Sequence, residues 1–137
     1  MSQQNIEIAK QAYEKFKSGD IQALLGLFTD DIDWQGPKVE NVPFATGKRS
    51  GREQAGQFFA SLADSQDVKT FEPREFIAQG EKVVALGYYS WRVKSTGREY
   101  QGDWAHVFTI RDGKIAGFQE YTDTAAIADA YQKAQSA

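Results

Sequence analysis

Cysteine is absent from the 137 residues, and histidine occurs once, as His106. Without cysteine the chain has no disulfide framework and no thiolate nucleophile, a composition that fits a reducing compartment. One histidine with no second ligand residue at metal-binding spacing does not make a metal site. The composition therefore excludes cysteine chemistry and predicts no metal centre.

Long apolar runs and nucleotide-binding motifs are missing as well. No stretch reaches the roughly 18 apolar residues of a membrane helix, and the polar N-terminus lacks the apolar run of a signal peptide. The chain has no G-x-S-x-G, no P-loop and no dinucleotide fingerprint. Its net charge is −3, without a cluster of lysine and arginine, which argues against nucleic acid. We expect a soluble, cytoplasmic protein without a cofactor, a nucleic-acid partner or a membrane association.

Aromatic residues, in contrast, are abundant. They make up 13% of the chain and include Trp34, Trp91 and Trp104. This content suits a binding pocket or an interface. The length is that of one domain, so residues 1–137 are expected to form a single unit.

Helical periodicity recurs along the chain. Apolar side chains at helical spacing over residues 6–16 and 21–28 predict two helices, with Gly19-Asp20 as the junction that ends one and caps the next. The spacing in Ser50-Gly51-Arg52-Glu53 is that of a capping box and predicts a third helix. A last helix is expected to begin at Thr122-Asp123.

Strands are predicted between and after these helices. A short strand covers residues 32–36, and longer β-forming runs cover 68–78, 83–93 and 98–110, with Pro73 placing the first of these at a sheet edge or a bulge. Residues 38–49 have no periodicity and are interpreted as a loop. Strands grouped after helices indicate an α+β fold in which a curved antiparallel sheet wraps around the helices.

The central stretch is a hairpin around Asp112-Gly113, a pair typical of a two-residue type I′ turn. Such a turn sets the register, which places Ala105 opposite Glu120 and Val107 opposite Phe118. One face of the hairpin then holds these four residues. The other face holds Trp104, His106, Phe108, Ile110 and Tyr121. Both faces are largely apolar, so Glu120 is a carboxylate on a covered apolar face, where charge is costly.

Two segments carry a family resemblance: SGDIQALLGLFTDDIDWQGP (18–37) and HVFTIRDGKIAGFQEYTD (106–123). They are similar to the SnoaL-like and ketosteroid-isomerase-like branch of the nuclear transport factor 2-like superfamily. The resemblance covers nearly the whole chain. It implies a cone-shaped half-barrel with three to four helices enclosing an apolar pocket, and a homodimer formed through the outer face of the sheet. We expect Trp104, Phe108 and Ile110 to contribute to that outer face.

The resemblance does not bring the ketosteroid isomerase residues with it. The family's general base falls on Gly36, its oxyanion-hole aspartate on Ala105 and its oxyanion tyrosine on Ala12. We therefore expect no efficient steroid isomerisation. SnoaL-type polyketide cyclases instead have an acidic general acid/base six residues after the lysine of the turn. Counting from Lys114 gives Glu120, one methylene longer than the family's aspartate.

Glu120 is the leading candidate for a general acid/base. The alternatives are an ion pair with Arg98 or Arg92, or a position on a solvated face. By strand alternation His106 lies on the opposite face, so the two cannot form a dyad unless a bulge shifts the register. His106 is then a structural or dimer-interface residue. The alternative is that His106 forms a second polar group of the pocket.

A ligand pocket is expected to be lined by aromatic and small side chains. The family's cavity-facing positions correspond to Trp34, Tyr89, Trp91 and Phe118, and core packing is the alternative for each. The predicted register adds Ala105 and Val107. Tyr13 either offers its hydroxyl to a ligand or packs in the core. Two functions fit these residues: a cofactor-independent isomerase or cyclase that transfers protons on a small hydrophobic carbonyl compound, and a non-catalytic domain that binds a small molecule or a partner in the same cavity.

Overall fold

A computed structural model describes residues 2–132 of the chain. Its elements follow one another as α1 (Ser2–Ser18), α2 (Ile21–Leu25), β1 (Phe28–Lys38), β2 (Thr46–Ser50), α3 (Gly51–Ser65), β3 (Gln66–Gln79), β4 (Lys82–Val93), β5 (Glu99–Arg111), β6 (Lys114–Tyr121) and α4 (Thr124–Tyr131).

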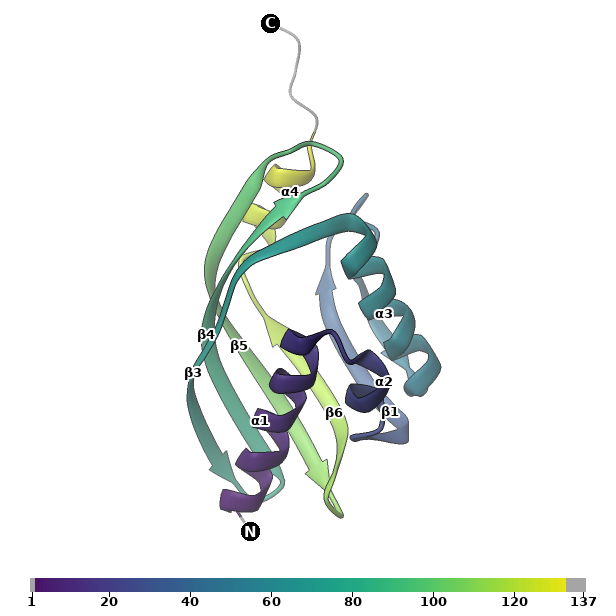
Figure 1. Ribbon diagram of the computed structural model, residues 1–137, viewed down its shortest axis with the longest axis vertical. Coiled ribbons are helices and arrows are strands. Elements are labelled where there is room, and N and C mark those ends of the chain that lie inside the picture. The colour runs from purple at the N-terminus through teal and green to yellow at the C-terminus, as the bar shows by residue number, and fades with distance from the viewer. Residues whose placement is uncertain (1, 133–137) are drawn as a thin grey trace, which may run out of the picture.

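The six strands form one curved sheet in the order β2-β1-β6-β5-β4-β3. Figure 1 shows the sheet bending around α1, with α3 beside β1 and α4 at the upper end. The expected α+β fold with a curved sheet around helices is therefore confirmed. Three details differ. The strands β1 and β6 are parallel, and residues 46–49, expected in a loop, belong to β2, which pairs with β1. The helix expected over residues 21–28 ends at Leu25, and Phe28 begins β1.

Local signals place the helix ends as expected. Gly19 has a positive φ of 78°, and the side chain of Asp20 accepts a hydrogen bond from the Ala23 amide at the start of α2. Asp123 caps α4 in the same way, through the Ala126 amide. These caps satisfy amides that have no partner inside the helix. Ser50 occupies the N-cap of α3 but makes no side-chain cap bond.

A close backbone approach shapes the middle of the sheet. The expected irregularity at Pro73 is present, because the β3–β4 register shifts between Pro73 and Glu75 and β3 is an edge strand. Opposite Pro73 lies Gly87, where an added Cβ would come 2.3 Å from Cζ2 of Trp104. Only glycine at this position leaves room for the indole, which lies on the concave side of the sheet.

The β5–β6 hairpin has the expected turn but not the expected register. Asp112 and Gly113 both have positive φ, as a type I′ turn requires. Pairing is as predicted at Arg111–Lys114 and Ile110–Ile115 and shifts by one residue after these two pairs, because Ala116 is an extra residue on β6. Ile115 and Phe118 are consequently both buried although three positions separate them.

This bulge reverses the predicted faces of the β5 side chains relative to Phe118 and Glu120 on β6. Beyond it His106 lies opposite Glu120 and Phe108 opposite Phe118, whereas Ala105 lies opposite Tyr121. The expectation that Trp104, Phe108 and Ile110 face outward toward a dimer partner is therefore wrong, and all three are buried in the core. Ala105 and Val107 alternate with these buried residues and are only partly buried.

In the part of the chain that the structure describes, none of the helices combines the length and apolar character needed to cross a bilayer.

Candidate active site

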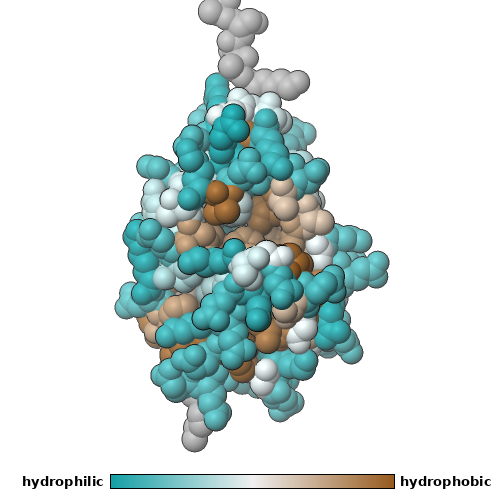
Figure 2. Space-filling model, viewed as in Figure 1, coloured by the Kyte–Doolittle hydropathy of each residue, from teal (hydrophilic) through white to brown (hydrophobic). Residues whose placement is uncertain are grey.

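A cavity lies between the concave face of the sheet and the helices α1 and α3. Its volume is about 70 Å³, and its walls are mostly aromatic and aliphatic. Figure 2 shows a central patch of hydrophobic residues on this side of the molecule, bordered by hydrophilic ones. An apolar concavity with a few polar groups is the usual form of a small-molecule site.

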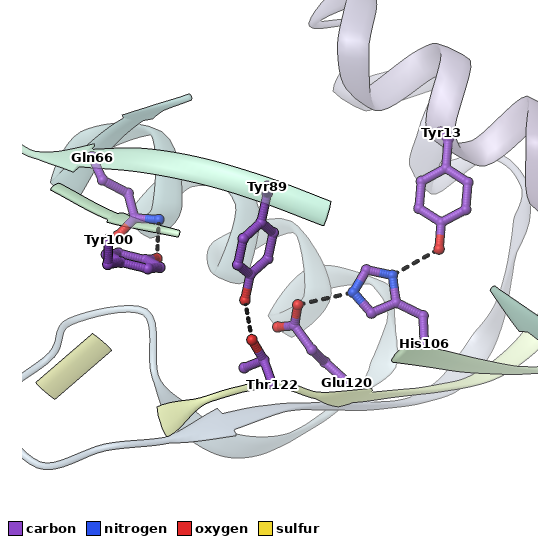
Figure 3. A network of polar contacts seen from close by, with 7 residues as sticks. All are labelled: Tyr13, Gln66, Tyr89, Tyr100, His106, Glu120 and Thr122. Carbon is purple, nitrogen blue, oxygen red and sulfur yellow. Dashed lines mark hydrogen bonds and ion pairs between the residues drawn. The ribbon is translucent and has the colours of Figure 1, made fainter. Parts of the chain in front are cut away.

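Three polar side chains from three elements meet at the wall of this cavity (Figure 3). The hydroxyl of Tyr13, on α1, lies 2.7 Å from Nδ1 of His106 on β5. Nε2 of His106 lies 2.8 Å from Oε2 of Glu120 on β6. The side chains of His106 and Glu120 are only 6% and 11% exposed. We call these three residues the acid/base chain.

In the acid/base chain, each hydrogen can be donated in the direction of Glu120. Burial, and then the negative charge of Glu120, hold the pKa of Tyr13 well above the usual value of a phenol. Tyr13 therefore remains protonated and can donate to Nδ1 of His106. A neutral imidazole then carries its hydrogen on Nε2 and donates it to the carboxylate. The hydrogen bond from His106 positions Oε2 of Glu120 and leaves Oε1 without a contact to the imidazole.

Aromatic contacts fix the imidazole ring in this orientation. Trp104 stacks on His106 with ring centroids 4.0 Å apart, and Phe118 meets it edge-on at 4.7 Å. Phe118 in turn stacks on Trp34 at 3.8 Å. Such packing limits the rotation of His106, so the distance to Glu120 is held by the core of the domain.

A tyrosine from β4 stands near the carboxylate on its other side (Figure 3). The hydroxyl of Tyr89 lies 2.5 Å from Oγ1 of Thr122. Burial, followed by the charge of Glu120, raises the pKa of Tyr89 far above its normal value. When Thr122 donates to the phenol oxygen, the hydrogen of Tyr89 is directed to the carboxylate of Glu120 or to a ligand beside that carboxylate.

A second polar cluster, the amide cluster, lies beyond Tyr89 and contains no charged group. Gln66, the first residue of β3, donates through Nε2 to the hydroxyl of Tyr100 at 2.7 Å. Its Oε1 accepts from the hydroxyl of Tyr131 on α4 at 2.6 Å. Gln66 and Tyr100 line the cavity and are buried.

The structure brings most of the predicted site residues to one cavity. Its lining includes Glu120 and His106, together with Tyr13, Trp34, Tyr89, Trp91 and Phe118. Ala105 and Val107 do not belong to the lining, because the bulge turns their side chains to the other face. The predicted separation of His106 from Glu120 is wrong for the same reason. The partner of Glu120 is this histidine rather than Arg98 or Arg92.

Sequence reasoning missed several lining residues. Gln66 and Tyr100 carry no distinctive sequence signal. A glutamine between a helix and a strand is typical of a loop, and Tyr100 is one of many aromatic residues. The bulge, in contrast, has a signal. Gly117 interrupts the strand pattern, and an isolated glycine in a strand often marks a bulge.

Within residues 2–132, no group of three or more histidine, aspartate and glutamate side chains is placed to hold a metal ion.

Comparisons with known proteins agree with this fold. A model of the SnoaL-like domain matches residues 9–118. An NTF2-like protein from Burkholderia xenovorans LB400 is 33% identical, with a TM-score of 0.87 over 96% of this chain and 98% of that chain. TerC, crystallised with polyporic acid, is 28% identical, with a TM-score of 0.76 over 93% and 97% of the two chains. A candidate polyketide cyclase from Xanthomonas campestris pv. campestris is 20% identical and shares the fold, with a TM-score of 0.75 over 94% and 97%. No functionally curated protein matches the chain.

Proposed function

The chain belongs to the SnoaL-like family, and we propose that it is a cofactor-independent enzyme that transfers protons on a small hydrophobic carbonyl compound. The observation that carries this proposal is the buried acid/base chain, in which His106 joins Glu120 to Tyr13 at distances of 2.8 and 2.7 Å. Buried, hydrogen-bonded titratable groups at the wall of an apolar cavity are typical of sites for acid/base catalysis.

In this mechanism Glu120 is the base. His106 holds one carboxylate oxygen, and the other takes a proton from the carbon next to the ketone. The electron pair of the broken C–H bond moves onto the carbonyl oxygen and forms an enolate. The phenol hydrogen of Tyr89 stabilises that oxygen, since donors in a water-poor site act strongly on developing charge.

The fate of the enolate separates an isomerase from a cyclase. Glu120 can return its proton to a different carbon, which moves a double bond. Alternatively, the enolate carbon attacks a second carbonyl of the same molecule and the new alkoxide takes the proton, which closes a ring. Both reactions balance without an added cofactor. The crystal structure of TerC with polyporic acid supports a small organic molecule as the ligand.

Deuterium exchange tests the proposal without knowledge of the natural substrate. We expect the protein to accelerate the exchange of the α-hydrogens of 2-tetralone, a bicyclic ketone, in D₂O, as followed by NMR. Glu120→Gln should abolish the acceleration, keep the affinity for 2-tetralone within about tenfold, and leave the stability near neutral pH equal or higher. Its amide can still accept from His106 but cannot exchange a proton in this way.

Glu99→Gln is the matched control, because Glu99 is half-exposed on β5 and pairs with Lys69. Exchange that survives in Glu120→Gln would rule out the carboxylate as the base. An unfolded Glu120→Gln protein would instead identify Glu120 as a structural partner of His106.

A non-catalytic binding domain is the second candidate function. It is supported by the absence of carboxylates at Gly36 and Ala105, and Gly36 has little room for one, because a Cβ there would lie 3.0 Å from Cε1 of Phe58. This function predicts that 2-tetralone binds while its hydrogens exchange only at the rate of the buffer. The same NMR samples distinguish the two functions.

We also infer a homodimer through the outer face of the sheet. The side chains available for it are the partly buried Leu86, Tyr88 and Val107 and the exposed Tyr121. Sedimentation at micromolar concentration tests this inference, and a monomer would contradict it.

A further inference from the structure

We propose that Gln66 and Tyr100 form a second polar subsite, which binds a hydroxyl or carbonyl oxygen at the end of the substrate remote from the reacting ketone. The subsite rests on the proposed function, because Glu120 defines the ketone end. It narrows the substrate class to flat, largely apolar ketones that carry one further neutral oxygen.

The first support is the position of the pair. Gln66 and Tyr100 are 2% and 7% exposed, and both line the same cavity as Glu120. A glutamine at such a depth is costly unless its amide is hydrogen-bonded. Its presence at the wall of an apolar cavity gives that wall a polar end opposite the acid/base chain (Figure 3).

The second support is a count of hydrogens. The amide oxygen of Gln66 accepts from Tyr131, and one amide hydrogen is donated to Tyr100. An amide nitrogen has two hydrogens and a phenol has one of its own. Among the hydrogen bonds of residues 2–132, the second amide hydrogen and the hydrogen of Tyr100 have no acceptor. Two unused donors side by side fit one acceptor oxygen.

The third support concerns charge. Burial, and then the nearby Tyr131 and Glu120, raise the pKa of Tyr100 far above its normal value, so its hydrogen is present at neutral pH. The donors carry no positive charge, and the carboxylate of Glu120 shares the cavity. An anionic group would therefore be repelled without compensation, whereas a hydroxyl or a carbonyl would be accepted.

The fourth support is the spacing of the two ends. The ring of Tyr89 lies 6.1 Å from that of Tyr100, and the hydroxyl of Tyr89 is beside Glu120 in Figure 3. One aromatic ring thus separates the amide cluster from the base. A flat ketone with a second oxygen at its far end matches this arrangement better than a ketone with one oxygen only.

The test compares 2-tetralone with its derivatives that carry a hydroxyl or a methyl group at C6 or C7. Binding is followed by the fluorescence of the three tryptophans. At least one hydroxyl derivative should bind about tenfold more tightly than 2-tetralone, as expected for one or two well-formed hydrogen bonds. The methyl derivative at the same carbon, which has nearly the same size but no polar atom, should gain less than about threefold.

Two variants locate the effect. In Tyr100→Phe and in Gln66→Leu the gain from the hydroxyl should fall below about threefold, and the affinity for plain 2-tetralone reports whether the cavity persists. Gln101→Leu is the matched control for Gln66→Leu, because Gln101 is exposed on β5 and should keep the full gain.

The proposal is overturned if neither hydroxyl improves binding, if methyl derivatives gain as much, or if the gain persists in both variants. The comparison of hydroxyl and methyl derivatives needs only the unmodified protein, so a variant that does not fold leaves the test intact. Failure of the proposed function would be detected separately, as hydrogen exchange of 2-tetralone that survives in Glu120→Gln. The gain in binding affinity from the hydroxyl group should be the same in that variant as in the original protein.

Discussion

The acid/base chain and the amide cluster occupy one cavity, but they use their hydrogens differently. In the acid/base chain, the hydrogens of Tyr13 and His106 are both directed along the chain toward the carboxylate of Glu120. In the amide cluster, Gln66 joins two phenols and leaves donors unused. The first arrangement holds a charge that can accept a proton, and the second offers neutral donors to an oxygen.

Under the proposed function, this difference separates the reaction at Glu120 from the recognition of the ligand at the amide cluster. A carboxylate buried among aromatic rings keeps its charge only if a partner stabilises it, and His106 provides that partner. A neutral amide has no such requirement. It can therefore be placed where the ligand completes its hydrogen bonds. Each of the following experiments breaks one side of this contrast or makes it sharper.

The largest effect is expected from His106→Phe, which removes the centre of the acid/base chain. The carboxylate of Glu120 then loses the hydrogen bond from His106 that positions it. We expect the rate of 2-tetralone exchange to fall by about 100-fold or more and the free energy of unfolding to fall because Glu120 is left buried and unpaired. NMR and urea denaturation measure the two quantities.

A control for His106→Phe lies on the neighbouring strand. Gln119→Leu alters a side chain that lies between two cavity residues of β6 and points to the other face. It should exchange 2-tetralone as fast as the original protein. If His106→Phe did the same, His106 would be a packing residue only.

Gln66→Leu is expected to have the next largest effect, and mainly on stability. It removes two hydrogen bonds and leaves the hydroxyl of Tyr131 without its acceptor. The free energy of unfolding should fall by about 2 kcal/mol, measured by urea denaturation. An equal or higher stability would show that the amide cluster contributes nothing to folding and that the leucine simply packs better.

Tyr13→Phe should have a moderate effect on exchange. It keeps the ring against Trp104, 5.7 Å between centroids, and removes only the donor to His106. We expect kcat for exchange to fall about tenfold while KM changes little, because the hydroxyl orients the imidazole rather than the ligand. A change confined to KM would mean that Tyr13 contacts the ketone instead.

The smallest effect is expected at alkaline pH. Burial raises the pKa of Tyr131 to about 12, above the value near 10 of an unfolded tyrosine. The folded state then holds this proton more tightly, so the contribution is complete below pH 10 and is lost progressively between about pH 10 and 12. Tyr131→Phe should make the decline of stability with pH less steep, as measured by urea denaturation from pH 8 upward. An unchanged slope would contradict the assignment.

Local chemistry made much of the fold predictable. The caps at Asp20 and Asp123 and the turn at Asp112-Gly113 depend on a few neighbouring residues, so their signals are contained in short stretches of sequence. Strand β2 was not predictable in this way. Its five residues are held by pairing with β1, and pairing between strands leaves little trace in either strand alone.

The candidate site was predictable in its parts but not in its assembly. Glu120 and the aromatic walls were identified from their types and positions. The partnership of Glu120 with His106 was not, because the extra residue Ala116 changes which side chains share a face. Strand alternation carries an error of one residue through the whole remainder of the strand. A pattern of Ile115 and Phe118 beside Gly117 was the available warning.

The extra residue Ala116 also determines which mutations would change the cavity most. No single substitution in β6 would turn Phe118 and Glu120 out of the cavity together, but the loss of one codon, that for Ala116, would remove the offset. We expect the shortened strand either to present these side chains on the convex surface or to fail to pair. A small in-frame deletion at this position would therefore change the lining of the cavity more abruptly than most single substitutions in β6.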